Sequence, residues 1–297
     1  MSDVPKHLYK YRAFGVNTLS VLVSGEVYYP APADFNDPLD CQPAIRMDLD
    51  RERAERLFHV LCAEVGVVTS PDDMAKLYNA PRSLIETFSG QDAEYLYLQR
   101  LATKILKLAV ARNETRGVFA LAERYDCPLM WSHYGDNHKG ICLEYDTSQH
   151  GLIDLKQVDY ALTRVIDAST LYEWKVQGLR SAGKLVDRHF FAAKAPDWDY
   201  EREWRVVHPL IGAGVAPFAL SGIYFGLRCP DPVKTTITKV FAGRPDIRFS
   251  SLFTTDSGFG LYPMIWSNEV REPREAFGVT TWFLQPGAQS SVFMDDE

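Results

Sequence analysis

Apolar residues along the chain follow two different spacings, and their order predicts a mixture of strands and helices. Aromatic and β-branched residues cluster at residues 8–11 and again at 27–29, which predicts two strands. The apolar stretch near Leu19–Leu22 lies between them and predicts a helix that ends at Gly25. From about residue 50 to 116 the pattern becomes helical, and the positions that share one face are clearest at Leu98, Leu101, Ile105 and Leu108.

The second half of the chain returns to strands. Residues 117–123 and 140–146 predict two strands that are joined through a polar run, and we expect them to pair antiparallel. A helix is expected near 168–189, and residues 198–208 alternate between charged and apolar positions, as in a strand with one wet face. A strand, helix, strand set follows at 223–226, 232–241 and 247–253. The order predicts an α+β fold.

Composition excludes a disordered chain and a chain with a basic surface throughout. Of 297 residues, 46% are hydrophobic and 24% are charged, which is typical of a folded protein. The net charge of −7 argues against a general nucleic-acid surface. An enzyme that acts on nucleic acid would gather its basic residues locally, and the helical block has such residues at Lys104, Lys107, Arg112 and Arg116.

Cysteine usage and the N-terminal residues predict a cytoplasmic protein without a membrane anchor. The five cysteines are irregularly spaced and include no CxxC pair, which favours reduced thiols. The first twelve residues are short, mixed and charged, unlike a targeting peptide. No stretch approaches the ~20 apolar residues of a membrane span.

A pair of glutamates in the predicted strand at 198–208 is the first candidate for chemistry. On a strand, Glu201, Glu203 and Arg205 would project to the same face. Two carboxylates beside a cation can differ in pKa, so that one stays ionised to stabilise positive charge or to orient a nucleophile. The same pattern also fits a solvated strand face with an ion pair.

The polar run at 131–140, Trp-Ser-His-Tyr-Gly-Asp-Asn-His-Lys-Gly, is the second candidate. A dense polar loop before a strand is often a functional site. His133, Asp136, His138 and Cys142 are potential metal ligands, although their spacing matches no zinc signature. The alternatives are a metal-free site and a structural loop. A hydrolase built on Ser132 and His133 is disfavoured because neighbours on a strand point apart and no GxSxG turn occurs.

The third candidate combines Arg12 with the loop Phe35–Asp40. An arginine at the end of a strand suits phosphate, because its guanidinium can bind two oxygens at once. Asn36 and Asp37 would fix its orientation or simply form a turn. Neither GxGxxG nor GxxxxGK[ST] occurs, so a dinucleotide-binding turn and a Walker loop are excluded.

From about Leu8 to Phe253, four motifs together resemble the bacterial domain-of-unknown-function family numbered twenty-nine seventy-one. These motifs are LYKYR, YYPAPADFNDPLD, MWSHYGDNHKGICLEYD and WDYEREWRV. The order of these elements is also similar to an ADP-ribosyltransferase core of bacterial toxins and defence proteins. That resemblance implies a split, mixed or antiparallel sheet interrupted by a helical insertion at about 50–116. It also implies that residues 1–256 form one core domain and 257–297 a C-terminal extension.

The resemblance also implies roles for residues. Arg12 would bind a phosphate of NAD, one of Ser132, His133 and Tyr134 would shape the nicotinamide pocket, and Glu203 would stabilise the transition state. Glu201 would orient the acceptor nucleophile. The remaining predicted NAD-binding residues are Tyr11, Asn36, Asp37 and His138.

The resemblance thus implies an enzyme with NAD as its substrate, no metal, and a protein or nucleic-acid acceptor. The resemblance implies a role as a toxin or phage-defence effector, with an antitoxin or regulatory partner, in the cytoplasm and away from membranes. An NAD glycohydrolase, a non-catalytic module that binds a nucleotide or a partner, and a metal-dependent nuclease or hydrolase are the alternatives.

Overall fold

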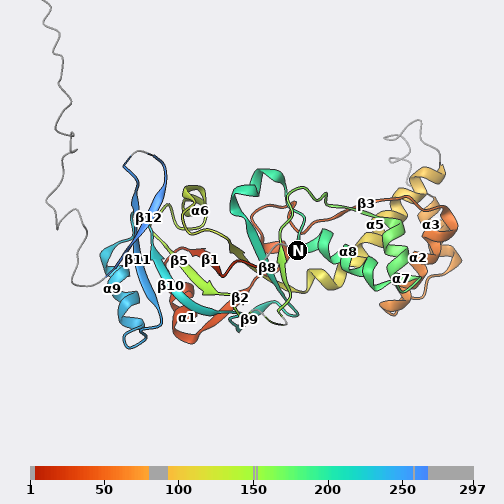
Figure 1. The fold of residues 1–297 in the computed structure, drawn as a ribbon. Helices are drawn as coiled ribbons and strands as arrows, with labels where there is room; N and C mark the ends of the chain where they lie inside the picture. Colours follow the sequence, from red (N-terminus) through yellow and green to blue (C-terminus); the bar gives the residue numbers. More distant parts are fainter. Residues whose placement is uncertain (1–3, 80–92, 150, 152, 257, 267–297) are drawn as a thin grey trace, which may run out of the picture.

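The protein is elongated, with a sheet at one end and a bundle of helices at the other (Figure 1). A computed structural model describes residues 4–79, 93–149, 151, 153–256 and 258–266. Across these residues the main sheet is mixed and has eight strands. The predicted α+β class is therefore confirmed.

The main sheet is almost entirely antiparallel. Its strands, in spatial order, are β12 (Leu261–Ile265), β11 (Arg248–Thr254), β10 (Ala219–Phe225), β5 (Ile141–Asp146), β1 (His7–Arg12), β4 (Gly117–Ala122), β8 (Glu203–His208) and β6 (Leu155–Gln157). Within the described part of this sheet, β10 and β11 are the only parallel neighbours, and helix α9 (Asp231–Val240) joins them. The predicted strand, helix, strand set is present.

One strand pairing differs from the prediction. The strands at 117–123 and 140–146 exist as β4 and β5, but they do not pair with each other, because β1 lies between them and is antiparallel to both. The connection that joins β4 to β5 contains α6 (Pro128–His133) and crosses β1. The polar run is therefore a crossover connection and not a hairpin.

Apolar side chains of the sheet pack against two helices. Helix α1 (Val16–Ser24) contributes Leu22 and α9 contributes Ile237 to a core that also contains Phe119 and Ile141 from the central strands. Helix α1 ends as predicted at Gly25, which has a φ of 70° and donates its N–H to the carbonyl of Val21. Strands β2 (Glu26–Tyr29) and β9 (Gly212–Val215) form a small antiparallel ribbon beside this core.

The helical end draws on two separate segments of the chain. Helices α2 (Arg51–Glu64), α3 (Pro71–Tyr78) and α5 (Ala93–Glu114) come from the predicted insertion. Helices α7 (Ala168–Lys175) and α8 (Arg180–Phe191) pack with them in one apolar cluster. Strands β3 (Ala44–Arg46) and β7 (Val165–Asp167) pair in parallel and connect the two segments. The helical end is thus larger than the insertion.

The sheet also continues past residue 256, because β12 pairs with β11 from Leu261 to Ile265. Of the predicted extension, residues 267–297 lie outside the described residues. Two short 3₁₀ helices, η1 (Pro32–Asp34) and η2 (Pro196–Glu201), lie in the connections. In the described part of the chain, no helix is both long and apolar enough to span a membrane.

Candidate functional site

The main sheet opens between β1 and β4. Among the described residues these strands are aligned at one pair, Tyr9 with Ala122, whereas β1 is aligned with β5 from His7 to Arg12. Beyond that pair, the Nζ of Lys10 reaches across and donates a hydrogen bond of 2.6 Å to the carbonyl oxygen of Ala120. A cavity of about 270 Å³ borders both strands at this opening.

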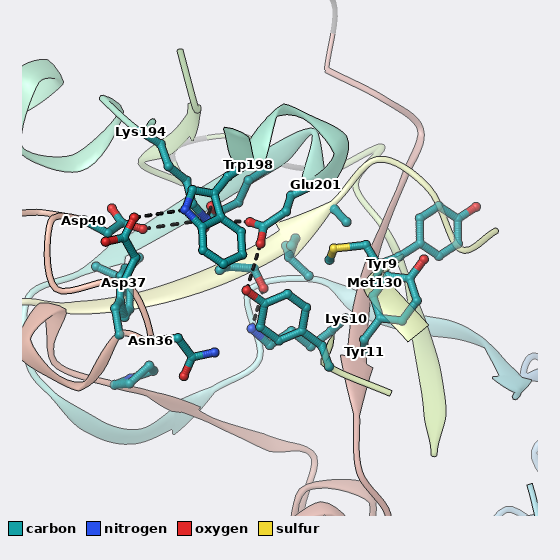
Figure 2. A pocket seen from close by; sticks show the side chains of 18 of the residues that line it. Tyr9, Lys10, Tyr11, Asn36, Asp37, Asp40, Met130, Lys194, Trp198 and Glu201 are labelled. Atoms are coloured by element: carbon teal, nitrogen blue, oxygen red, sulfur yellow. Dashed lines mark hydrogen bonds and ion pairs between the residues drawn. The ribbon is translucent and has the colours of Figure 1, made fainter. Parts of the chain in front are cut away.

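The cavity is enclosed by segments far apart in the sequence (Figure 2). Strands β1 and β4 form one side, and the η1 loop, the end of α6 and the η2 segment form the others. The charged and aromatic residues that line it are Tyr9, Lys10, Tyr11, Asp34, Phe35, Asp37, Asp40, Tyr134, Lys194, Trp198, Glu201 and Glu203.

A buried arginine, Arg205, binds two of the carboxylates that line the cavity. The side chain of Arg205 is fully buried, and its guanidinium donates to both oxygens of Asp40, at 2.9 and 2.6 Å. It also donates to both oxygens of Glu203, at 2.8 and 2.9 Å. The carbonyl oxygen of Phe191 accepts another hydrogen bond of 2.9 Å. Buried charges need such complete pairing, because removal of one partner leaves an uncompensated charge.

Lys194 joins three carboxylates at the cavity wall. Its Nζ lies 2.5 Å from an oxygen of Glu201, 2.8 Å from Glu203 and 3.7 Å from Asp40. Burial by itself would lower the pKa of Lys194, but Glu203 and Glu201 outweigh it, so the net pKa is raised. Lys194 is therefore a fixed positive charge.

Glu201 and Glu203 have pKa values that are shifted in opposite directions. Burial would raise the pKa of Glu203, but Arg205 and Lys194 lower it to about 2. For Glu201 burial dominates and the charge of Glu203 adds to it, so its pKa is raised despite Lys194. Two neighbouring carboxyl groups with separated pKa values are typical of an acid or base beside a permanent anion.

The backbone between the two glutamates differs from the predicted strand. The strand β8 begins only at Glu203, while Trp198 and Glu201 lie in η2. Between them Arg202 adopts a left-handed conformation, with φ 43° and ψ 58°, which is uncommon for a residue other than glycine. This turn points the exposed Arg202 away and brings both carboxylates to Lys194.

Lys10 is the second cation that lines the cavity. Its side chain is half-buried, and its Nζ lies 5.2 Å from the ring centre of Phe119. Burial, and then the charge of Arg12, lower its pKa to about 8, although Glu203 and Glu201 act in the opposite direction. In the described part of the chain Lys10 forms no ion pair.

Aromatic rings and hydroxyls complete the wall. The Nε1 of Trp198 donates to Asp37 at 3.0 Å, which fixes the ring beside the cavity. The hydroxyl of Tyr134 donates to Glu201 at 2.8 Å. The Phe35 ring lies 5.3 Å from the Arg205 guanidinium. The arrangement places a flat apolar surface next to the paired carboxylates.

The structure brings together six of the ten predicted site residues. The predicted residues that line the cavity are Tyr11, Asn36, Asp37, Tyr134, Glu201 and Glu203. Tyr11 is buried, and its hydroxyl donates to the carbonyl of Arg124 at 2.8 Å. The motifs at 35–40 and 200–205 therefore meet at the cavity.

Arg12 is outside the cavity. It lies about 7 Å further along β1 than Lys10, where the chain turns into α1, and it borders a shallow hollow with residues 13–18. Its Nε is buried and has no partner among the described residues. The basic residue of the first strand that faces the site is thus Lys10.

Ser132 and His133 also lie outside the cavity, and both belong to helix α6 and not to a strand. Both are exposed, and the hydroxyl of Ser132 donates to the carbonyl of Pro128 at 3.0 Å. The His133 ring lies 6.5 Å from Trp198, at the outer side of η2. The structure therefore does not place these two side chains at the predicted pocket.

His138 belongs to the loop before β5, and its main chain is hydrogen-bonded to the segment that follows β10. Asp136, Asn137 and His138 are all left-handed, with φ of 50°, 52° and 67°. The carbonyl of His138 accepts the N–H of Arg228 at 2.9 Å, and its ring stacks on buried Trp131. Burial, and then Arg228, lower the pKa of His138. Across the described residues no group of three or more His, Cys, Asp and Glu side chains is arranged to hold a metal ion.

Sequence reasoning missed Lys194, Lys10, Asp40 and Trp198. Lys194 had a signal, because it interrupts the apolar run Phe190–Ala195, where a single charge is typical of a buried, paired group. Asp40 had none, because an aspartate in a turn-rich loop is most simply explained by the turn.

The segment from α6 to β8 carries the similarity to a known family. Residues 130–206 match the family described as protein of unknown function (DUF2971). The match includes the loop at 131–140, Lys194 and both glutamates, and it supports the family resemblance found in the sequence. No match was found among the curated proteins or the solved structures.

Proposed function

We propose that the protein is an NAD-dependent ADP-ribosyltransferase that acts on a macromolecule, as a toxin or phage-defence effector. One observation carries the proposal: the carboxylates of Glu201 and Glu203 meet at Lys194 within a cavity that has aromatic walls. Paired carboxyl groups beside a sugar are the usual means of stabilising an oxocarbenium-like centre.

The two carboxylates would have different tasks. Glu203 remains ionised through Arg205 and Lys194, so it can stabilise the positive charge that develops on the ribose. As the C1′–N bond breaks, nicotinamide leaves with the bonding electrons. The acceptor oxygen or nitrogen then bonds to C1′ and gives its proton to Glu201, which would act as the general base.

The charge of the cavity supports a cationic substrate group. Five carboxylates line it, from Asp34, Asp37, Asp40, Glu201 and Glu203, against two lysines. The nicotinamide ring of NAD is positively charged and planar, which suits an acidic cavity with aromatic rings. The two phosphates of NAD would lie outside this excess of negative charge.

The size of the cavity supports the same orientation. Sites for whole drug-sized ligands span roughly 300–1,000 Å³, and this cavity holds about 270 Å³. It would therefore take the nicotinamide riboside end of NAD, and the remainder would extend through the mouth.

An NAD glycohydrolase is the second candidate, and the burial of Glu201 favours it. Only 5% of that side chain is exposed, so a small acceptor such as water reaches it more easily than a macromolecule does. The chemistry at C1′ is otherwise the same. Product analysis separates the candidates, because free ADP-ribose marks the hydrolase and labelled macromolecule marks the transferase.

The test is the release of nicotinamide from NAD, alone and with cell lysate. We expect release by the wild type, and a loss of about 10²–10⁴-fold in the Glu201→Gln variant, typical for removal of a general base. Glu114→Gln, at an exposed position near the end of α5, is the matched control and should keep full activity. No release by the folded wild type in either condition would refute the proposal. Calorimetric binding of NAD without release would indicate a non-catalytic module instead.

A further inference from the structure

The two lysines of the cavity have opposite surroundings. Lys194 contacts three carboxylates, which hold it as an ammonium ion. Lys10 instead donates to a neutral carbonyl, that of Ala120, and lies beside the Phe119 ring. Figure 2 shows them reaching into the cavity from different sides. Only Lys10 has the surroundings of a lysine that can lose its proton near neutral pH.

Lysines become nucleophiles when they are desolvated or lie near another cation. Both conditions hold for Lys10, because it is half-buried and Arg12 acts on it electrostatically. Burial and Arg12 lower its pKa to about 8, against about 10.4 for a free lysine. The carboxyl groups of Glu201 and Glu203 are close enough to influence it, so an acid or base is at hand.

We propose that Lys10 is an amine nucleophile that forms an imine with the aldehyde carbon of a small polyhydroxy aldehyde, such as an open-chain sugar, bound in the cavity. The lining provides partners for hydroxyl groups at Asn36, Asp37 and Glu201. This activity goes beyond the cleavage of NAD and does not depend on it.

The step is balanced without an added reagent. The lone pair of the neutral Lys10 amine attacks the carbonyl carbon, the carbonyl oxygen takes up a proton from Glu201, and the nitrogen, which now carries a positive charge, returns one proton to the Glu201 carboxylate. Glu201 then protonates the hydroxyl group of the neutral carbinolamine, which leaves as water, and the nitrogen gives its remaining proton back to Glu201 as the C=N bond forms. Hydrolysis reverses the sequence and restores the amine.

The experiment traps the imine by reduction. The intact protein is incubated with glyceraldehyde and cyanoborohydride in the absence of NAD, and the labelled lysines are located by peptide mass spectrometry. We expect label at Lys10 well before Lys194 and before exposed Lys184 of α8. The labelling rate at Lys10 should rise with a midpoint near pH 8.

Two results would overturn the proposal: labelling of Lys184 at pH 8 with Lys10 unlabelled, or a labelling rate at Lys10 that shows no midpoint near pH 8. The Lys10→Arg variant keeps the positive charge and should lose the fast phase. The main measurement uses the wild type, so a folding defect in that variant does not affect it. Because NAD is absent, a failure here leaves the proposed cleavage of NAD to its own test.

Discussion

Asp40 and Arg205 form a two-pronged ion pair across 165 positions of sequence, with hydrogen bonds of 2.9 and 2.6 Å. The pair joins the loop after η1 to the centre of β8, and both side chains are almost completely buried. It therefore holds the aromatic side of the cavity against the sheet.

The first prediction concerns this pair. Asp40→Asn removes the negative charge, and Glu203 is then the one described carboxylate paired with Arg205, so we expect a loss of roughly 3–5 kcal/mol in the free energy of unfolding. Urea denaturation measures it. Asp246→Asn removes a partner of Arg244 in an exposed pair, and this control should have a far smaller effect because water screens exposed charges. Equal effects of the two substitutions would contradict the buried role of Asp40.

The second prediction is a pH dependence at Glu203. Its pKa is lowered from an ordinary 4.5 to about 2 in the folded protein. The ionised folded form is favoured, so its stabilisation is complete above pH 4.5 and is lost as the pH falls from 4.5 toward 2.

Glu203→Gln should therefore destabilise the protein most at neutral pH, and its difference from the wild type should shrink across that acid range. Unfolding curves at several pH values measure this difference. A difference that stays constant between pH 7 and 3 would show that the charge of Glu203 contributes nothing.

The third prediction concerns the hydroxyl of Tyr134. It donates to Glu201 at 2.8 Å and stabilises the carboxylate, so Tyr134→Phe should raise the pKa of Glu201 further. The acid limb of the pH profile of NAD cleavage should therefore move to higher pH. Tyr28→Phe, at an exposed position in β2, should leave the profile unchanged.

The fourth prediction follows from the excess of carboxylates. Nicotinic acid adenine dinucleotide, whose ring carries a carboxylate in place of the carboxamide, should have a lower kcat/KM than NAD. Two like charges about 8 Å apart at an effective dielectric of about 20 repel by roughly 2 kcal/mol, which is about 30-fold in kcat/KM. Asp37→Asn should reduce the ratio of kcat/KM for NAD to kcat/KM for nicotinic acid adenine dinucleotide. Equal values of kcat/KM for both substrates in the wild type would exclude the proposed orientation.

The fifth prediction concerns Gly140. A Cβ at this position would collide with the carbonyl of Arg12 on the neighbouring strand, so Gly140→Ala should lower the free energy of unfolding by about 1–3 kcal/mol. At Gly15, the N-cap of α1, a Cβ would meet nothing within 4 Å, so Gly15→Ala is the control without a collision and should cost only the poorer capping by alanine, roughly 0.5–1 kcal/mol. Thermal unfolding measures both.

Local patterns predicted the elements well where one period dominates. The helix that ends at Gly25 and the strand, helix, strand set around α9 are both present, because their apolar spacing agrees with the packing. The position of β1 between β4 and β5 was not predictable, because it depends on pairing between residues more than a hundred positions apart.

The site was predictable in its motifs but not in its geometry. Glu201 and Glu203 were found from their spacing, yet the reason why they meet is Lys194 and the left-handed Arg202, and not a shared strand face. The alternation of side chains along β1 could not distinguish Lys10 from Arg12, because residues two positions apart on a strand point to the same face. Which of the two meets the cavity depends on where α1 begins.

The parting of β1 and β4 has a consequence for mutagenesis. At that opening a bound ligand would lie against the main chain of two central strands, as the Lys10 side chain does at the carbonyl of Ala120. Apart from proline, every residue carries the same peptide N–H and C=O groups, so contacts to them do not depend directly on the side chain. A scan of side-chain substitutions would then underestimate how much the main chain of the sheet contributes to binding. The side chains that line the cavity could differ between related chains while these main-chain contacts are kept.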